Sequence, residues 1–186
     1  MQPSKREAVL DTAERLFYEE GFHATGIDRV VAEAGVARMT LYNHFPSKEV
    51  LIESVLVRRY RRYLDDLRDA VAARGQGSAV GALARRHNHW LRHRAPNGCI
   101  VLKAIGEFDR HCSAIAERGR ALKGELLALL VEAAAMDGHD DAAAEQVLLL
   151  LEGASALAPV LGPARAVAHV EAMLGSLPGG DSVQPS

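Results

Sequence analysis

The stretch that determines the fold is TGIDRVVAEAGVARMTLYNHFPSK, residues 25–48. Its first half places apolar residues on one face of a helix. These residues are Ile27, Val30, Val31 and Ala34. Gly35 ends that helix, because glycine adopts a left-handed backbone at little cost. A second short helix is predicted over residues 38–43, and Pro46 forces its end. Two short helices joined by a tight turn are typical of the helix-turn-helix, whose second helix enters the DNA major groove.

Thr25 and Asp28 have the spacing of a capping box, so we expect Thr25 to cap the first of these helices. The second helix and its border carry hydroxyl, amide, imidazole and cationic groups that can reach phosphates and base edges. These groups belong to Arg38, Thr40, Tyr42, Asn43, His44 and Lys48. An ordinary helical corner with a polar exposed face has the same pattern, so the pattern alone leaves both interpretations open.

The run AGVARMTLYNHFPSKEVL, residues 34–51, favours the DNA-binding interpretation because it resembles the signature of TetR-type (AcrR-like) bacterial transcriptional regulators. The matching residues are Ala34, Gly35, Val36, Thr40, Leu41, Tyr42, His44, Phe45, Ser47, Lys48, Glu49 and Leu51. The upstream EEGFHATGIDRV, residues 19–30, resembles the family's loop between its first two helices. Ala37 departs from the family's usual serine, which could weaken the helix start by about 1 kcal/mol. Met39 stands where glycine is common and could contact a thymine methyl group.

The resemblance covers about the first quarter of the chain and implies an all-α protein of about nine helices. Residues 1–47 would form a three-helix helix-turn-helix domain, residues 48–177 an effector-binding and dimerisation domain, and residues 178–186 a disordered tail. It also implies a homodimer through the last two helices, a palindromic operator in double-stranded DNA, and a small-molecule effector that releases a repressor. No cofactor is implied.

Individual roles at the DNA also follow from the resemblance. It implies that one group of residues holds phosphates, namely Thr25, Thr40, Tyr42 and Lys48. A second group lies nearer the base edges, namely Arg38, Met39, Asn43 and His44. We therefore expect both groups on the surface of the helix-turn-helix.

Composition indicates a globular protein without a uniformly basic surface. The chain has 186 residues, 48% hydrophobic and 25% charged, with a formal net charge of -2. Residues 1–48 contain six Lys/Arg and seven Asp/Glu, so any positive surface must be local. Nothing resembles a signal peptide or a membrane-length apolar run. With two cysteines, the expected compartment is the cytoplasm.

The rest of the chain shows helical periodicity and no strand-like alternation. The predicted helices cover about 4–21, 48–73, 98–112, 113–136, 141–158 and 163–174, and one more begins at residue 78 and ends before the turn at 96–98. Ser4 with Glu7 has the spacing of a capping box at the start of the first of these helices. Ser47 can cap the helix over 48–73, and Asp140 is a plausible cap for the helix over 141–158. The basic run Arg58–Arg62 could support DNA binding electrostatically, but we favour a solvated face offset by the aspartates at 65–69. The apolar run Val147–Leu151 argues for burial on more than one side of its helix, which supports a dimer interface.

No enzyme constellation is present: phosphate-binding glycine loops, nucleophile elbows and HExxH zinc motifs are all missing. We therefore predict that the chain is not an enzyme. Several residues on the apolar faces of the middle helices could line a ligand pocket, although packing in the core would explain their positions equally well. They are His87, Trp90, Val101, Ile105 and Phe108.

Histidine and cysteine residues leave alternatives open. His89 and His93 lie one helical turn apart, close after His87, at a spacing that can chelate a metal. Cys99 and Cys112 could sense thiol chemistry. The arginines that share the helix with these histidines, Arg85, Arg86 and Arg92, disfavour a cation, and we predict no metal site. A metal- or thiol-sensing regulator of the same fold remains an alternative, as does a ligand-binding protein whose DNA head no longer functions.

Overall fold

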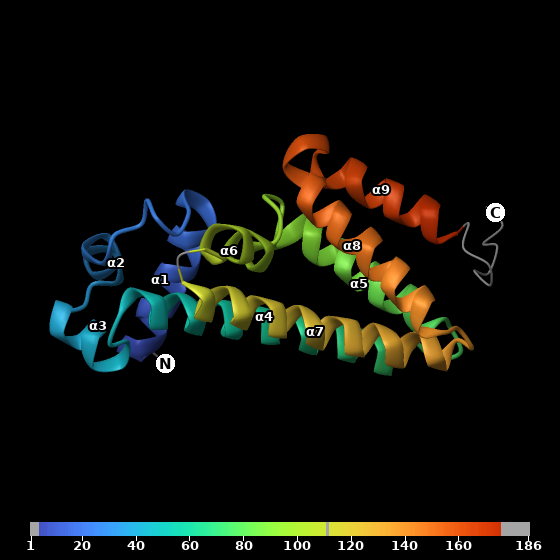
Figure 1. The fold of residues 1–186 in the computed structure, drawn as a ribbon, viewed down its shortest axis with the longest axis horizontal. Coiled ribbons are helices and arrows are strands. Elements are labelled where there is room, and N and C mark those ends of the chain that lie inside the picture. The colour runs from blue at the N-terminus through green and yellow to red at the C-terminus, as the bar shows by residue number, and fades with distance from the viewer. Residues whose placement is uncertain (1–3, 111, 176–186) are drawn as a thin grey trace. The chain divides into compact units, whose positions relative to one another are not determined.

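The computed structural model describes residues 4–110 and 112–175, and this part of the chain is helical with no strand (Figure 1). Its helices are α1 (Lys5–Glu20), α2 (Ile27–Ala34), α3 (Arg38–His44), α4 (Lys48–Ala72), α5 (Ala79–His93), α6 (Ile100–Phe108), α7 (Ser113–Met136), α8 (Asp141–Leu161) and α9 (Pro163–Leu174). The predicted all-α class and the predicted number of helices are confirmed. The tail predicted at 178–186 lies outside the described residues.

The chain folds into two compact units. The first comprises residues 1–62 and 100–122, and the second comprises residues 63–99 and 123–186. The chain therefore passes from one unit to the other inside α4, just before α6, and inside α7. Each unit combines segments that are distant in the sequence.

The first unit begins with a capping box that the sequence predicted. The Ser4 Oγ accepts the Glu7 backbone N–H at 3.2 Å, and the Glu7 carboxylate accepts the Ser4 N–H at 3.0 Å. The helix that follows buries one apolar stripe. Its members are Val9, Leu10, Ala13, Leu16 and Phe17. Helix α1 contacts both α2 and α3 and therefore supports the helix-turn-helix.

Only part of the basic run of α4 is the solvated face that we predicted: Arg61 and Arg62 are exposed, whereas Arg58 and Arg59 are half-buried. Arg58 and Arg59 each place a guanidinium nitrogen 2.9 Å from a Glu14 carboxylate oxygen, and Arg62 also pairs with Glu14. Arg58 contacts Asp11 as well, at 2.8 Å. Asp11 and Glu14 are neighbours on one face of α1 because they lie three residues apart. The arginines therefore tie α4 to α1 rather than to the downstream aspartates.

In the second unit, the turn after α7 holds the start of α5. The Asp137 carboxylate accepts the backbone N–H groups of Ala79 at 2.8 Å and Val80 at 2.9 Å, and the Ser78 hydroxyl at 2.7 Å. Ser78 itself caps the helix by accepting the Gly81 N–H. The first backbone N–H groups of a helix have no acceptor within the helix, and the oxygens of Asp137 and Ser78 accept from them here.

The loop before α6 explains why that helix begins later than predicted, at Ile100 instead of residue 98. Gly98 has a φ of 90°, so it cannot be the first residue of a helix. A Cβ at this position would lie 2.8 Å from the Ser155 carbonyl oxygen of α8. Pro159 has no N–H to donate to that carbonyl, which is four residues earlier in α8. Only glycine allows the loop to approach α8 this closely.

Helices α8 and α9 pack on each other and α5 packs on α9. Asp140 caps α8 as predicted, accepting the Ala143 N–H at 3.0 Å. The helix continues past the predicted end at residue 158. Contrary to our expectation, α8 is also long and apolar enough by composition to cross a membrane, with a mean hydropathy of 1.4. Large apolar side chains remain exposed on this helix pair: Leu149, Leu157, Val160 and Met173.

Candidate nucleic-acid interface

The predicted helix-turn-helix is present in the first unit. Helix α2 ends at Gly35, whose φ of 64° and ψ of 34° are the left-handed conformation expected there. Val30 of α2, Leu41 of α3 and Phe45 after α3 are buried and fix the two helices. The rest of α3 is therefore left to face outward.

Thr25 does not occupy the position that we predicted. The N-cap of α2 is Gly26, with no side-chain cap. Thr25 is 0% exposed, and its hydroxyl donates to the carbonyls of Gly21 at 2.9 Å and Leu16 at 3.3 Å. Because the Thr25 hydroxyl is buried and bonds to these two carbonyls, it stabilises the loop after α1 and is not accessible to a phosphate.

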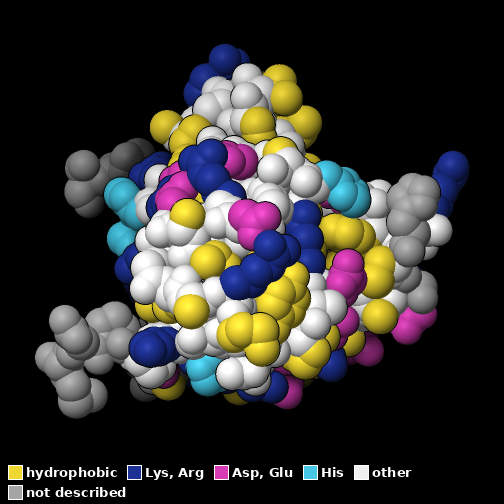
Figure 2. All heavy atoms as spheres, turned by 90° about the vertical axis from the view of Figure 1, so that its left-hand side faces the viewer, with side chains coloured by type: hydrophobic (Ala, Val, Ile, Leu, Met, Phe, Trp, Pro, Cys, Tyr) yellow, Lys and Arg dark blue, Asp and Glu magenta, His cyan; other side chains and the backbone are white. Residues whose placement is uncertain are grey.

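Helix α3 presents the other predicted side chains. Arg38, Met39, Asn43 and His44 are exposed, with Met39 at 69%. The half-buried members of the set are Thr40 and Tyr42. The helix starts at Ala37 without a side-chain cap, as the departure from serine predicted. On the face shown in Figure 2, which looks at the end that carries α2 and α3 in Figure 1, basic, acidic and apolar side chains are interspersed.

Arg38 is held from two sides. Its Nη1 lies 2.9 Å from the Asp28 Oδ1 of α2, and its guanidinium carbon lies 5.9 Å from the centre of the Tyr42 ring. A hydrogen bond with Tyr42 and the charge of Asp28 raise the pKa of Arg38. Asp28, which we had assigned to a capping box, instead reaches across to the recognition helix.

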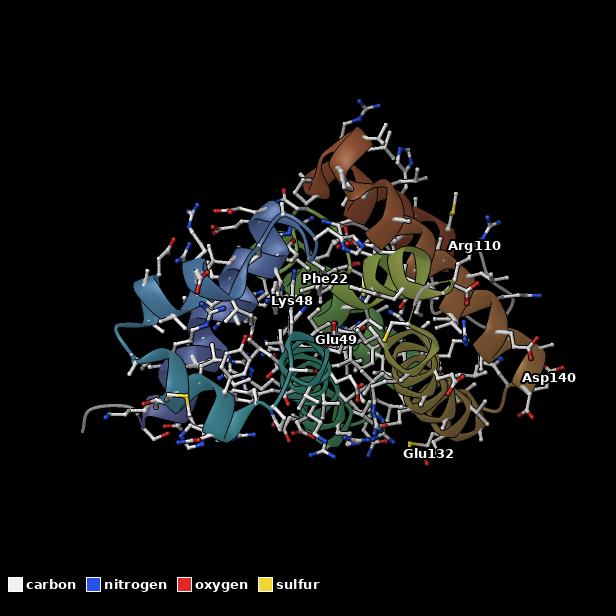
Figure 3. The ribbon with its side chains drawn as sticks, turned by 60° about the vertical axis from the view of Figure 1, so that its left-hand side comes forward. Phe22, Lys48, Glu49, Arg110, Glu132 and Asp140 are labelled. Atoms are coloured by element: carbon white, nitrogen blue, oxygen red, sulfur yellow. The ribbon has the colours of Figure 1, made fainter. Side chains whose placement is uncertain are left out.

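Lys48 is the first residue of α4, and Ser47 caps that helix as predicted by accepting the Val50 N–H at 3.3 Å. Figure 3 shows Lys48 at this helix start, with Phe22 in the loop between α1 and α2. Burial lowers the pKa of Lys48, whereas the carboxylates of Glu49 and Glu107 oppose that shift. The ammonium group is thus half-buried beside acidic groups.

Three glutamates of α1 and α2 form ion pairs with two arginines of the same helices. Glu33 pairs with Arg15 and with Arg29, the latter at 2.5 Å. Arg29 also pairs with Glu20 at 2.9 Å, and Arg15 pairs with Glu19 at 3.3 Å. Hydrogen bonds from Arg29 and Arg15 lower the pKa of Glu33. Two arginines thus compensate these three glutamates only in part, whereas Asp11, Glu14 and Asp28 of the same helices pair with arginines of α3 and α4.

The end of α6 contacts the loop that leads into the helix-turn-helix. The Phe108 ring lies 5.5 Å from Phe22, which in turn lies 5.5 Å from Phe17 of α1. His23 places its Nε2 3.2 Å from the Glu107 Oε1 and its ring 5.3 Å from Phe108. From the sequence, Phe108 was only one residue of an apolar helix face. Its contact with Phe22, 86 positions earlier, could not be predicted from local periodicity.

The predicted pocket residues fall into both units. Val101 and Phe108 are buried in the first unit. Ile105 lines a cavity of about 330 Å³ in the same unit, whose other lining residues are mainly charged and include Arg110 (Figure 3). In the second unit, His87 and Trp90 share Tyr63 as a neighbour, at ring distances of 6.0 and 5.3 Å. The pocket therefore stays a prediction.

Within residues 4–110 and 112–175, the histidines and cysteines form no larger cluster. The rings of His89 and His93 lie 4.5 Å apart on the exposed side of α5. Among the described residues, no group of three or more side chains is arranged to hold a metal ion. Cys99 and Cys112 are free and half-buried.

Comparison with known proteins extends the likeness from the helix-turn-helix to the whole fold. Residues 9–55 match the family described as bacterial regulatory proteins, tetR family. The chain is 46% identical over 52 residues to the uncharacterised HTH-type transcriptional regulator YxaF of Bacillus subtilis, covering 27% of each protein. It is 40% identical over 63 residues to the HTH-type transcriptional repressor KstR2 of Rhodococcus jostii, covering 34% of this chain and 29% of that protein. These matches span between a quarter and a third of the curated relatives' length.

A solved structure covers much more of the chain. SCO4454 of Streptomyces coelicolor, described as a TetR-family transcriptional regulator, superposes with a TM-score of 0.83. It is 31% identical in sequence, and the match covers 89% of each chain. The likeness therefore includes the helices that follow the helix-turn-helix.

Proposed function

Because this chain belongs to the TetR family of bacterial transcriptional regulators, we propose that it binds operator DNA and represses transcription until a small-molecule effector releases it. The observation that carries the proposal is helix α3, whose inner face is buried at Leu41 while Arg38, Met39, Asn43 and His44 are exposed. A short helix with exposed polar side chains after a tight turn is suited to the major groove.

Each side chain has a role in this proposal. Arg38, Met39, Asn43 and His44 read base edges or lie at their border, and Met39 offers an apolar contact to a thymine methyl group. Thr40, Tyr42 and Lys48 position the helix on phosphates. Thr25 keeps no side-chain contact with DNA in this scheme, since its hydroxyl is bonded inside the protein.

The proposal includes a homodimer through α8 and α9. Leu149 and Val160 are 74% and 76% exposed, which is unusual for apolar side chains unless another surface covers them. Two copies are also needed to read a palindrome, whose half-sites lie roughly 34–36 Å apart. This pairing would account for the apolar character of α8 without a membrane.

Release by an effector requires that the ligand bind one state of the dimer better than the other. We assign effector binding and dimerisation to residues 48–177. Helix α4 is a candidate lever, since its residues belong to both compact units and its first residue is Lys48. We assign the protein to the cytoplasm, with no cofactor and no catalytic role.

The experiment that tests this function is selection of bound DNA from a random library by the purified protein, at two salt concentrations. A recovered palindrome is expected, and its half-site spacing should match one helical turn or a multiple. Recovery of only salt-sensitive binding without sequence preference would contradict the proposal, since that behaviour comes from phosphates alone.

A further inference from the structure

A buried polar cluster in the second unit surrounds His87. The Tyr63 hydroxyl lies 2.8 Å from the His87 Nδ1, and the Ser155 Oγ lies 3.3 Å from the His87 Nε2. His87 is 3% exposed, and burial, together with the nearby charge of Lys123, lowers its pKa to about 3. The ring is therefore neutral at physiological pH, and both of its nitrogens have partners.

An ion pair completes the cluster. The Lys123 Nζ donates to the Glu152 Oε1 at 2.6 Å and lies 3.3 Å from the Cys99 Sγ. Although burial lowers the pKa of Lys123, the neighbouring Cys99 and Glu152 raise it, and the net shift is upward. One ammonium and one carboxylate thus cancel, and neutral His87 adds no charge.

One oxygen in this cluster has no partner within the described part of the chain. It is the second carboxylate oxygen of Glu152, Oε2, which is buried and accepts no hydrogen bond. Buried polar atoms are nearly always bonded, and an ionised carboxylate can only accept. The missing group is therefore a hydrogen-bond donor.

An aromatic pair adjoins the same cluster. The Trp90 ring lies 5.3 Å from the Tyr63 ring, and Trp90 is half-exposed on α5, three residues after His87. Aromatic side chains provide large flat contacts for other rings. His87 contacts Tyr63 through one ring nitrogen and Ser155 through the other, and Ser155 lies three residues after Glu152 on α8, so the ion pair and the aromatic pair belong to one site.

The side chains of this cluster, which we call the Glu152 site, are Tyr63, His87, Trp90, Lys123, Glu152 and Ser155. We infer that the site binds an uncharged aromatic molecule whose O–H or N–H group donates to the Glu152 Oε2. A charged ligand is disfavoured because the cluster has no net charge to compensate it. The inference rests on the proposed function, since this molecule would be the effector.

Trp90 makes the test direct, because it is the only tryptophan in the chain and its fluorescence reports on the site. The probes are 4-ethylphenol, which is uncharged at neutral pH, and 4-ethylanisole, which has the same ring but no donor. We expect 4-ethylphenol to change the Trp90 emission and to bind about tenfold or more tightly than the anisole, because hydrogen bonds to charged groups are the stronger class. Equal binding of the two compounds, or binding of neither, overturns the inference.

A variant pair assigns the preference to Glu152. Glu152→Gln removes the charge and should abolish the preference for the phenol, whereas Glu145→Gln, on an exposed position of the same helix, should keep it. A thermal melt accompanies each variant, and the comparison of the two probes on the unmodified protein needs no variant at all. A preference that survives in folded Glu152→Gln protein overturns the assignment.

The inference and the proposed function fail separately. If DNA selection recovers a palindrome but neither probe binds, the proposed DNA-binding function is supported and the inferred effector class is wrong. If the phenol binds but no sequence-specific DNA is recovered, the site stands and the regulator does not.

Discussion

The Nη1 of Arg38 lies 2.9 Å from the Oδ1 of Asp28, so an ion pair joins the first residue of the recognition helix to α2. Both side chains are more than half exposed, and exposed ion pairs contribute little to stability. The contact instead restricts where the guanidinium group lies before DNA arrives. In the proposed function, this contact makes the Asp28 carboxylate of α2 part of the surface that reads DNA.

Arg38→Ala should relax the base preference of the protein at one operator position, at a cost of about 1–3 kcal/mol for the preferred base. The measurement is binding to the selected operator and to its single-base variants. Asp28→Asn should weaken the same preference without lowering the melting temperature. If Arg38→Ala weakens cognate and random DNA equally, the side chain does not read a base.

Lys48→Ala should weaken binding to every DNA sequence alike, because a lysine that meets a phosphate carries no sequence information. The slope of log K against log salt should fall by roughly one for each phosphate that is no longer neutralised. Arg61→Ala is the control, since this exposed cation lies on the same helix. An unchanged slope in the Lys48 variant would show that this lysine does not bind a phosphate.

Acid should destabilise the protein through His87. In the unfolded chain a histidine binds its proton near pH 6.5, whereas folded His87 does so only at about pH 3. Between these pH values unfolding takes up a proton, so the free energy of unfolding falls as pH falls, by up to about 1.4 kcal/mol per pH unit from this group. Denaturant titrations at several pH values measure this slope.

His87→Gln should flatten the same pH dependence between pH 6.5 and 3, because glutamine does not titrate. His169→Gln, at an exposed histidine of α9, should leave it unchanged. An equal slope in the protein with and without His87 would show that other groups cause the acid sensitivity.

Val160→Glu should dissociate the homodimer, because it places a charge on a side chain that we assign to the subunit interface. The valine is exposed within one chain, so the fold itself should tolerate the change. Sedimentation analysis measures the dimer, with Met136→Glu at an exposed apolar position of α7 as the control. A variant that remains dimeric would place the interface elsewhere.

Local patterns were sufficient to predict the helices and the turn. Ser4 with Glu7, Gly35 and Asp140 each act within a few residues, and the structure has all three as predicted. Thr25 shows the limit of such reasoning, because the same hydroxyl can cap a helix or bond buried carbonyls. Only the packing of α1 against the loop determines which occurs.

Contacts between distant positions could not be predicted in this way. Glu14 has the three arginines of α4 as partners some 44 to 48 positions later, and Lys123 meets Glu152 from another helix. Nothing in the local periodicity specifies which acid meets which base. Of the Glu152 site, the sequence analysis therefore named only His87 and Trp90 as pocket candidates, since the members come from four helices.

The contact between Phe22 and Phe108 limits how this protein can be recombined. Moving residues 1–47 of this chain onto a relative would transfer Phe22 and His23 but would not transfer Glu107 and Phe108. A hybrid would then place one protein's loop against another protein's α6. Successful hybrids should need a compatible ring and acid at the end of α6, and so a change of operator preference by exchange of the head alone depends on residues far downstream in the chain.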